Sequence, residues 1–380
     1  MNHYKTHVCL VSAQAAPNLL PLLDDQLKPE SVILLVTPQM KSKAEWLANV
    51  ITPRGIRVEK VEISAAADFT AIQEILFNIV GKYEENPDEI ALNATGGTKW
   101  MSIAAQEIFR LNKSPVFYVD VETDNVFFLG DNKPTQKLTQ KIDIANYLKT
   151  YGYQITNEDK RGLPQEHKDL CEQMVLHVAD WESAIGQLNL LANKAEESNT
   201  LKAIIEDASR LPIYFDTLIA ECSNAGLIEG NIRNGIKFKD DNARNFCNGG
   251  WLEGYVNRIL SELRKEELLQ EQPHLNVKVK KEKSSENEID VAFMAKNRLH
   301  IIECKTKRFS GKQAGQAGTD TVYKLDSISE LGGLGTKAML VSYRPLKNAD
   351  KQRAKDLRIE IVERDQIQNL KTHLRNWINK

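Results

Sequence analysis

The first 130 residues alternate between short apolar runs rich in β-branched residues and longer amphipathic stretches. The apolar runs predict strands, and the amphipathic stretches predict helices between them. This alternation is typical of a mostly parallel sheet covered by helices, closed by an antiparallel edge strand. Strands are expected at residues 7–12, 31–37, 57–63, 89–93, 115–121 and 125–129, and helices at 18–27, 41–51, 69–83 and 99–111.

The middle of the chain, residues 163–240, reads as helical and carries an acidic excess. A helix at 214–224 stops at Ala225-Gly226, and a short hairpin over 227–229 and 236–238 turns at Asn234-Gly235. Helices followed by such a hairpin resemble a winged helix-turn-helix. Because modules of this kind often serve as dimerising spacers, the pattern does not by itself predict DNA reading.

The last part opens with an expected long helix at 244–269, followed by strands at 275–281, 288–293 and 299–304. A helix, a strand at 338–343 and a final helix–strand–helix complete it. We therefore expect an α/β protein of three parts. These are a Rossmann-like domain (1–150), a helical, winged-helix-like spacer (151–243) and a second α/β domain (244–380).

Composition places the chain among globular proteins, with 42% hydrophobic and 27% charged residues over 380 positions. No apolar run reaches the ~18–20 residues that a membrane span needs, and the polar N-terminus does not resemble a signal peptide. The 5 cysteines are scattered, without a CxxC pair. This pattern favours reduced thiols in the cytoplasm over disulfides or a zinc site.

Charge is distributed unevenly along the chain. Residues 244–380 hold 26 Lys and Arg against 18 Asp and Glu, a net +8, which leaves −10 for residues 1–243. A basic C-terminal block suits a polyanion such as nucleic acid, although a lysine-rich solvated surface would give the same count.

Charged residues also mark the ends of two consecutive predicted strands in the C-terminal part. Asp290 lies on the first of them, and Glu303 and Lys305 end the second. Residues two apart in a strand point to the same face, so Glu303 and Lys305 project together, and hairpin pairing would bring Asp290 beside them. Glu253, on the preceding helix, could approach the same edge.

This constellation suits metal-assisted phosphodiester hydrolysis. A divalent cation neutralises developing charge and acidifies the attacking water, and carboxylate and carbonyl oxygens hold Mg²⁺ or Mn²⁺. Asp290, Glu303 and the Cys304 carbonyl are candidate metal ligands, with Glu253 binding directly or through water. Lys305 would orient the nucleophile and stabilise the phosphorane-like charge. The candidate catalytic set is Glu253, Asp290, Glu303 and Lys305.

A second polar cluster follows strands of the N-terminal part. The string Asn93-Ala94-Thr95-Gly96-Gly97-Thr98-Lys99 ends the fourth strand and opens a helix, where free N–H groups and glycines suit a phosphate. Loops at Ser12-Ala13-Gln14 and at Thr37-Pro38-Gln39 end strands at the same sheet edge. The string is neither GxxxxGK[ST] nor GxGxxG, and a plain glycine turn with Thr98 as helix cap is the competing interpretation.

The C-terminal residues match the PD-(D/E)xK pattern of restriction-endonuclease-like nucleases. Asp290 takes the Asp position, Glu303-Cys304-Lys305 is the ExK element, and Glu253 fits the Glu that often precedes them. The chain departs from the pattern in one place, since Ile289 stands where the proline would be.

The N-terminal string resembles the ligand-binding motif of CARF domains, the Rossmann-like sensors of CRISPR-linked cyclic oligoadenylates. A CARF domain, a winged-helix-like spacer and a PD-(D/E)xK domain form the layout of the CRISPR ancillary nucleases. The resemblance implies a homodimer that binds one cyclic tetra-adenylate and then cuts nucleic acid with Mn²⁺ or Mg²⁺. Activation is then expected to pass through the helical spacer. The ring would be held by Asn93, Thr95, Gly96, Gly97, Thr98 and Lys99, and less specifically by Ser12, Ala13, Gln14, Thr37 and Gln39.

Two other functions remain open at this point. One is a nuclease that acts in repair or restriction without a nucleotide signal. The other is a nucleotide-responsive DNA-binding regulator that has no catalysis. The intact set of Asp290, Glu303 and Lys305 disfavours the regulator.

Overall fold

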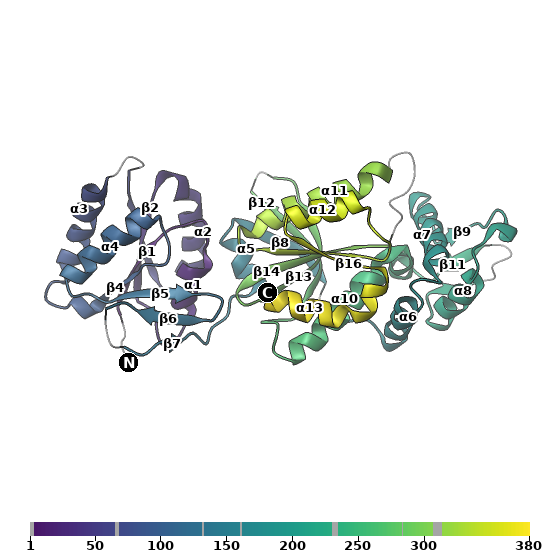
Figure 1. The fold of residues 1–380 in the computed structure, drawn as a ribbon, viewed down its shortest axis with the longest axis horizontal. Coiled ribbons are helices and arrows are strands. Elements are labelled where there is room, and N and C mark those ends of the chain that lie inside the picture. The colour runs from purple at the N-terminus through teal and green to yellow at the C-terminus, as the bar shows by residue number, and fades with distance from the viewer. Residues whose placement is uncertain are drawn as a thin grey trace.

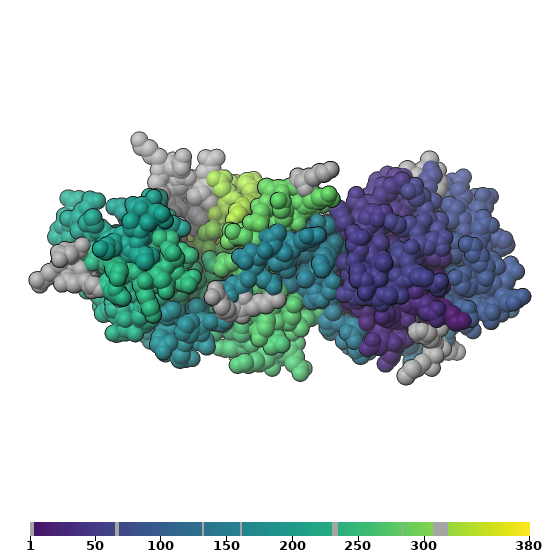
Figure 2. Space-filling view, turned by 180° about the vertical axis from the view of Figure 1, so that it is seen from behind, coloured from purple at the N-terminus to yellow at the C-terminus, as the bar shows by residue number. Residues whose placement is uncertain are grey.

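The computed structural model describes residues 4–64, 68–130, 133–159, 162–229, 235–282, 284–306 and 314–380. Three bodies follow one another in space, as Figure 1 and Figure 2 show. The N-terminal domain lies at one end, the C-terminal sheet domain in the middle and the helical spacer at the far end. The spacer therefore lies beyond the C-terminal sheet domain in space, although it stands between the two sheet domains in the sequence. No helix among the described residues is long and apolar enough to cross a membrane.

The N-terminal domain is built on a seven-stranded sheet in the order β3-β2-β1-β4-β5-β6-β7. Strand β6 pairs antiparallel with β5 on one side and with β7 on the other. Helices α1 and α2 pack in the core on one face and α3 and α4 in the core on the other, which confirms the Rossmann-like α/β prediction. The strands are β1 (Thr6–Leu10), β2 (Ser31–Val36), β3 (Arg57–Glu62), β4 (Ile90–Asn93), β5 (Val116–Asp120), β6 (Asn125–Phe128) and β7 (Gln136–Lys137). The helices are α1 (Ala16–Leu23), α2 (Lys41–Ile51), α3 (Phe69–Val80) and α4 (Lys99–Leu111).

The C-terminal sheet has six strands in the order β16-β15-β14-β13-β12-β8. Helices α11 and α12 lie on one face and α10 and α13 on the other (Figure 1). The elements are β12 (His274–Lys281), β13 (Asn287–Ala295), β14 (Arg298–Lys305), β15 (Lys337–Ser342), β16 (Ile359–Glu363), α10 (Trp251–Lys265), α11 (Ala314–Ser329), α12 (Asn348–Asp356) and α13 (Leu370–Asn379).

Strand β8 (Tyr153–Asp159) corrects the predicted spacer boundary at residue 151. It leaves α5 (Ile144–Lys149) and pairs antiparallel with β12 at the edge of the C-terminal sheet. An edge strand exposes much of its surface and can stay polar. Its sequence, YQITNED, therefore carries no strong strand signal, and the boundary could not be read from hydrophobicity.

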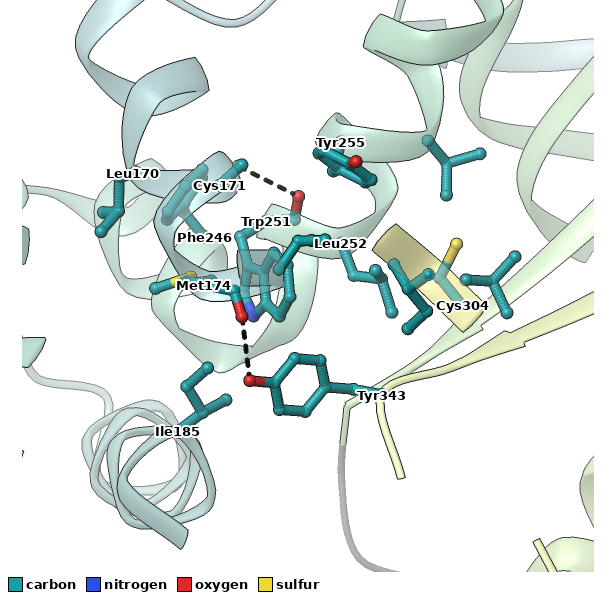
Figure 3. Close-up of a cluster of buried hydrophobic side chains, with 14 of the residues drawn as sticks. Leu170, Cys171, Met174, Ile185, Phe246, Trp251, Leu252, Tyr255, Cys304 and Tyr343 are labelled. Carbon is teal, nitrogen blue, oxygen red and sulfur yellow. Dashed lines mark hydrogen bonds between the residues drawn. The ribbon is translucent and has the colours of Figure 1, made fainter. Parts of the chain in front are cut away.

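The spacer contains α6 (Gln165–Leu176), α7 (Glu182–Glu197), α8 (Phe215–Asn224) and the expected hairpin, β10 (Ile228–Glu229) and β11 (Ile236–Phe238), to which β9 (Lys202–Ala203) adds a third strand. Asn234 of the predicted turn lies outside the described residues. The spacer shares one core with the C-terminal sheet (Figure 3). In this core, the Tyr343 hydroxyl donates a hydrogen bond to the Met174 carbonyl at 3.0 Å. The spacer and the C-terminal sheet domain therefore pack against each other without a solvent gap in this core.

The helix predicted at 244–269 is broken. Helix α9 (Asp241–Asn245) passes through a wide turn, Phe246–Gly250, into α10. Gly249 has φ +123°, and a Cβ on it would lie 2.5 Å from the Thr306 hydroxyl. The break lets the chain pass closely over the end of β14, where Thr306 follows Lys305, and only glycine tolerates both conditions.

The N-terminal domain contacts the C-terminal sheet directly through the tips of two hairpins. Asp124, in the turn between β5 and β6, accepts a hydrogen bond from the Asn297 amide in the turn between β13 and β14, at 2.6 Å. Glu122 and Arg298 form an ion pair beside it. On the other side, Tyr147 of α5 donates to the Gly332 carbonyl at 2.9 Å. One core cluster runs through this junction.

Candidate active site and ligand pocket

Strands β13 and β14 bring the C-terminal charged residues together as the spacing predicted. The two strands pair with Val291 opposite Ile302, which leaves Asp290 beside Glu303. The Asp290 carboxylate accepts the backbone N–H of Cys304 at 2.8 Å. The Lys305 ammonium lies 2.6 Å from a Glu303 carboxylate oxygen. Glu303 is almost completely buried, with 1% of its surface exposed.

Glu253, in the first turn of α10, completes the cluster from the opposite face of the sheet. Burial, followed by the negative charge of Asp290, raises the pKa of Glu253 to about 8. Burial and the charge of Glu303 raise the pKa of Asp290 to about 6. Burial lowers the pKa of Lys305, but Glu303 and Asp290 more than offset this effect and raise it overall. Three carboxylates, of which Glu303 is buried and Glu253 and Asp290 are partly exposed, thus lie near one partly exposed ammonium.

These donors fit a hard divalent cation. Crowded carboxylates that repel one another in a poorly solvated place are stabilised by added positive charge. Within the described part of the chain, no three His, Cys, Asp or Glu side chains already converge as a metal cage. Glu303 is instead engaged by two ammonium groups, Lys305 and, at 3.3 Å, Lys324 of α11.

A large groove runs from this cluster into the spacer. Its volume is about 1210 Å³, more than a small-molecule pocket usually has. Glu253, Cys304 and Lys305 line one end, whereas Asp290 and the buried Glu303 do not line the groove. The spacer lines the other end with polar and charged groups of both signs, among them Glu166, Asn224, Lys239 and Asp240. The spacer therefore forms a wall of the space that the catalytic candidates face.

A second pocket, of about 410 Å³, lies at the carboxyl edge of the N-terminal sheet. The structure brings together there six of the residues predicted to bind a ligand, and also adds Trp100. The six are Ser12, Ala13, Thr37, Gln39, Gly97 and Thr98. Gln14 and Lys99 are exposed nearby but do not line this pocket.

Asn93, Thr95 and Gly96 lie beneath the loop and support it. The Asn93 amide, which is fully buried, donates to the Pro17 carbonyl at 2.9 Å, and its oxygen accepts the Thr95 hydroxyl at 2.7 Å. Thr95 in turn accepts the backbone N–H of Val119 on β5. A Cβ on Gly96 would lie 2.0 Å from the Leu10 carbonyl oxygen. These three residues thus support the loop, and none of them lines the pocket.

Two residues of these sites were missed from the sequence. Trp100 follows the glycine string directly, and its 55% exposure, unusual for tryptophan, is a property that only the fold reveals. Lys324 lies 19 residues after Lys305 on a helix with ordinary amphipathic spacing, so nothing in the sequence indicated that it reaches Glu303.

Known families match both ends of the chain. Residues 6–147 match the Card1 CARF domain, and residues 240–380 match the Card1-like endonuclease domain. The chain carries a Card1-type CARF domain and a Card1-like endonuclease domain. No curated protein sequence matches the chain.

Solved structures extend the similarity over the whole length, spacer included. Protein VC1899 from Vibrio cholerae is 27% identical, with a TM-score of 0.88 over 100% of this chain and 98% of its own. Can2 from Sulfobacillus thermosulfidooxidans, solved in complex with cyclic tetra-adenylate, is 29% identical, with a TM-score of 0.81 over 99% and 98%. A type III CRISPR defence DNA nuclease activated by cyclic oligoadenylate shares the fold, at 17% identity and a TM-score of 0.55, over 90% of this chain and 45% of that protein.

Proposed function

We propose that this protein is a metal-dependent endonuclease of type III CRISPR defence that a cyclic oligoadenylate activates. The observation that carries the proposal is the cluster of Glu253, Asp290, Glu303 and Lys305 inside a Card1-like endonuclease domain. A chain that had lost catalysis would gain nothing from keeping three carboxylates crowded together in a poorly solvated place, because their mutual repulsion costs folding free energy there.

Glu253, Asp290, Glu303 and the Cys304 carbonyl would hold Mn²⁺ or Mg²⁺. A divalent cation in this place supplies charge neutralisation and a more acidic water. Lys305 holds its proton, because the neighbouring carboxylates raise its pKa. Its ammonium is therefore available to stabilise negative charge that develops on the scissile phosphate. Asp290 is fixed for its role by the hydrogen bond from the Cys304 N–H.

The pocket at the carboxyl edge of the CARF sheet is the proposed activator site. Can2, the relative solved with cyclic tetra-adenylate, covers nearly the whole of this chain, which makes that ring the first ligand to test. Ser12, Thr37, Gln39 and Thr98 offer hydrogen-bonding groups, and Trp100 offers a flat face for an adenine. Lys99 and Gln14 are exposed beside it, where a ring larger than the pocket would extend.

A homodimer would complete this site. A ring of repeated adenylates presents the same groups on opposite sides, so two copies of one loop related by a two-fold axis can grip it. Helices α3 and α4, whose N-terminal parts border the pocket, expose large apolar side chains that a second copy would cover, namely Phe77, Ile103 and Leu111.

The proposal is tested by incubating the full chain with plasmid DNA and with single-stranded DNA and RNA. Each reaction is run with Mn²⁺, Mg²⁺ or EDTA, and with or without cyclic tetra-adenylate. We expect cutting that needs the cation and rises with the ring. Cutting that ignores the ring at saturating concentration would favour an ungated repair or restriction nuclease. No cutting, together with DNA binding that responds to the ring, would favour a regulator.

A further inference from the structure

Lys324 belongs to the surroundings of the catalytic cluster although it lies outside the motif. Its ammonium is 3.3 Å from a Glu303 carboxylate oxygen, the same oxygen that Lys305 contacts. The Lys324 side chain nevertheless keeps 53% of its surface exposed, whereas Lys305 keeps 32%. Lys324 thus presents a positive charge to solvent at the edge of the cluster, within reach of whatever Lys305 contacts.

The fold holds this position firmly. Glu303 shares a face of the sheet with Leu299 and Ile301, since residues two apart in a strand point the same way. Helix α11 covers that face and buries Val322, Leu325 and Ile328 in the same core. Lys324 lies between these anchors on the helix, so its backbone cannot drift away from Glu303.

An exposed aromatic ring lies next to Lys324 on the same helix. Tyr323 is 50% exposed, and the guanidinium of Arg353 from α12 lies 5.3 Å from its ring centre. Arg353 is itself fixed, because it donates to Thr319 and pairs with Asp350 at 3.0 Å. Figure 1 shows α11 and α12 side by side over one face of the sheet. The arginine contact therefore holds the orientation of an aromatic ring that is half exposed to solvent.

A cation and an aromatic face at neighbouring positions match the repeating chemistry of a nucleic-acid strand. Each nucleotide offers one phosphate for an ammonium and one base for stacking, and single-strand binding sites combine these two contacts. The groove that the spacer bounds is lined by Lys305 but by neither Tyr323 nor Lys324. The α11 surface therefore adds groups beyond those that line that groove, and Lys324 is joined to Lys305 through Glu303.

We propose that Tyr323 and Lys324 form a substrate-strand platform, in which Lys324 binds a phosphate next to the scissile one and Tyr323 stacks on a base. This inference rests on the proposed nuclease function. In the absence of substrate, Lys324 rests on Glu303. When a nucleic-acid strand binds, the Lys324 ammonium moves from Glu303 to the phosphate. Glu303 then keeps its contact with Lys305.

The test uses the full chain with Glu303→Gln as the parent, which removes cutting and releases Lys324 from its partner. Binding of fluorescein-labelled single-stranded oligonucleotides is measured by anisotropy in EDTA over a series of salt concentrations. DNA and RNA of the same sequence are both tried, and the tighter binder is used. Lys324→Ala and Tyr323→Ala are added to the parent separately. Matched controls are Lys82→Ala, an exposed lysine of the CARF domain, and Tyr118→Ala, whose ring is 45% exposed there.

We expect Lys324→Ala to weaken binding about five- to tenfold and to reduce the salt slope by about 0.7, the value for one phosphate contact on a single strand. Tyr323→Ala should weaken binding by about the same factor without changing the salt slope, because stacking releases no counterions. Both controls should stay within about twofold, the spread expected for surface substitutions.

Two failures can be told apart. If the parent binds and both α11 variants bind equally well, the platform is wrong while the nuclease proposal stands. A loss confined to one of the two residues overturns the role of the other. If the parent binds neither oligonucleotide and the unmodified protein cuts neither, the proposed function fails and this inference fails with it.

Discussion

The Asn297 amide donates to the Asp124 carboxylate at 2.6 Å and thereby joins the endonuclease domain to the CARF domain. Asn297 sits in the turn between β13 and β14, the strands that carry Asp290, Glu303 and Lys305. Asp124 follows β5, whose Val119 N–H donates to Thr95 in the loop under the pocket of the CARF domain. A short path of strands and hydrogen bonds therefore connects the two domains outside the spacer. It offers a second candidate route for activation, beside the expected one through the spacer.

The first prediction is that Asn297→Gly uncouples the two domains. Asn297 has φ +54°, which glycine adopts freely, so the turn survives while the amide is lost. Cyclic tetra-adenylate binding and basal cutting should persist. The coupling free energy between ring binding and cutting should fall by about 0.5–2 kcal/mol. Calorimetry and cutting rates with and without the ring measure the two quantities.

Lys296→Gly is the matched control, because Lys296 shares this turn with φ +50° but points to the Asn379 carbonyl. It should activate like the unmodified protein. Equal activation of both variants would show that the signal travels elsewhere.

The second prediction concerns the catalytic cluster. Glu303→Gln keeps the shape of the side chain but removes the charge that would bind a cation, so cutting should fall by orders of magnitude. Cyclic tetra-adenylate affinity, measured by calorimetry, should not change. Glu330→Gln, an exposed residue just beyond α11, should cut normally. Full activity of Glu303→Gln at matched Mn²⁺ would exclude this site.

The third prediction concerns Lys99. Removing its ammonium with Lys99→Ala should weaken binding of cyclic tetra-adenylate by about 1–3 kcal/mol, the usual value for a hydrogen bond to a charged group. Metal-dependent basal cutting should continue. Lys113→Ala, beyond the far end of α4, serves as the control in the same calorimetric titration. An unchanged affinity would mean that the ring does not reach Lys99.

The fourth prediction separates support from ligand contact. Asn93→Ala should lower the stability of the CARF domain by about 1–3 kcal/mol, because it leaves the Pro17 carbonyl and the Thr95 hydroxyl without their buried partner. Scanning calorimetry should show a lower Tm without ligand, whereas Lys99→Ala should leave the Tm unchanged. An unchanged Tm in Asn93→Ala would contradict the scaffold role.

The fifth prediction is a pH dependence at the joint between β8 and β12. Burial lowers the pKa of His274, but hydrogen bonds to Glu271 and Glu158 outweigh it and raise the pKa above its usual value. The interaction of protonated His274 with the two carboxylates stabilises the folded state fully below about pH 6.5, the pKa of an unfolded histidine. This stabilisation is lost as the pH rises through the raised pKa of the folded state. The unfolding free energy lost in His274→Gln should therefore be larger at pH 6 than at pH 8.5. A loss that is constant over this range in urea titrations would contradict the charged pairing.

The sequence by itself determined most of the elements and the grouping of the charged residues in the C-terminal domain. Hydrophobic periodicity marked the buried strands of both sheets, because a strand packed on two faces must be apolar almost throughout. Spacing placed Asp290, Glu303 and Lys305 together, because a hairpin pairs neighbouring strands and side chains alternate along them. The position of the glycine string at the end of a strand could also be predicted from the sequence. The structure gives the reason, because the backbone passes so close to the end of β1 that only glycine fits.

Only the tertiary structure decided how these parts meet. Strand β8 belongs to the edge of the C-terminal sheet and not to the spacer, and the endonuclease domain lies between the CARF domain and the spacer. Asn93 lies beneath its loop, and Lys324 contacts Glu303 from a separate helix. Each of these outcomes depends on contacts between residues far apart in the chain. Local propensity says nothing about such contacts, which follow from how buried surfaces pack and which polar groups find partners when they do.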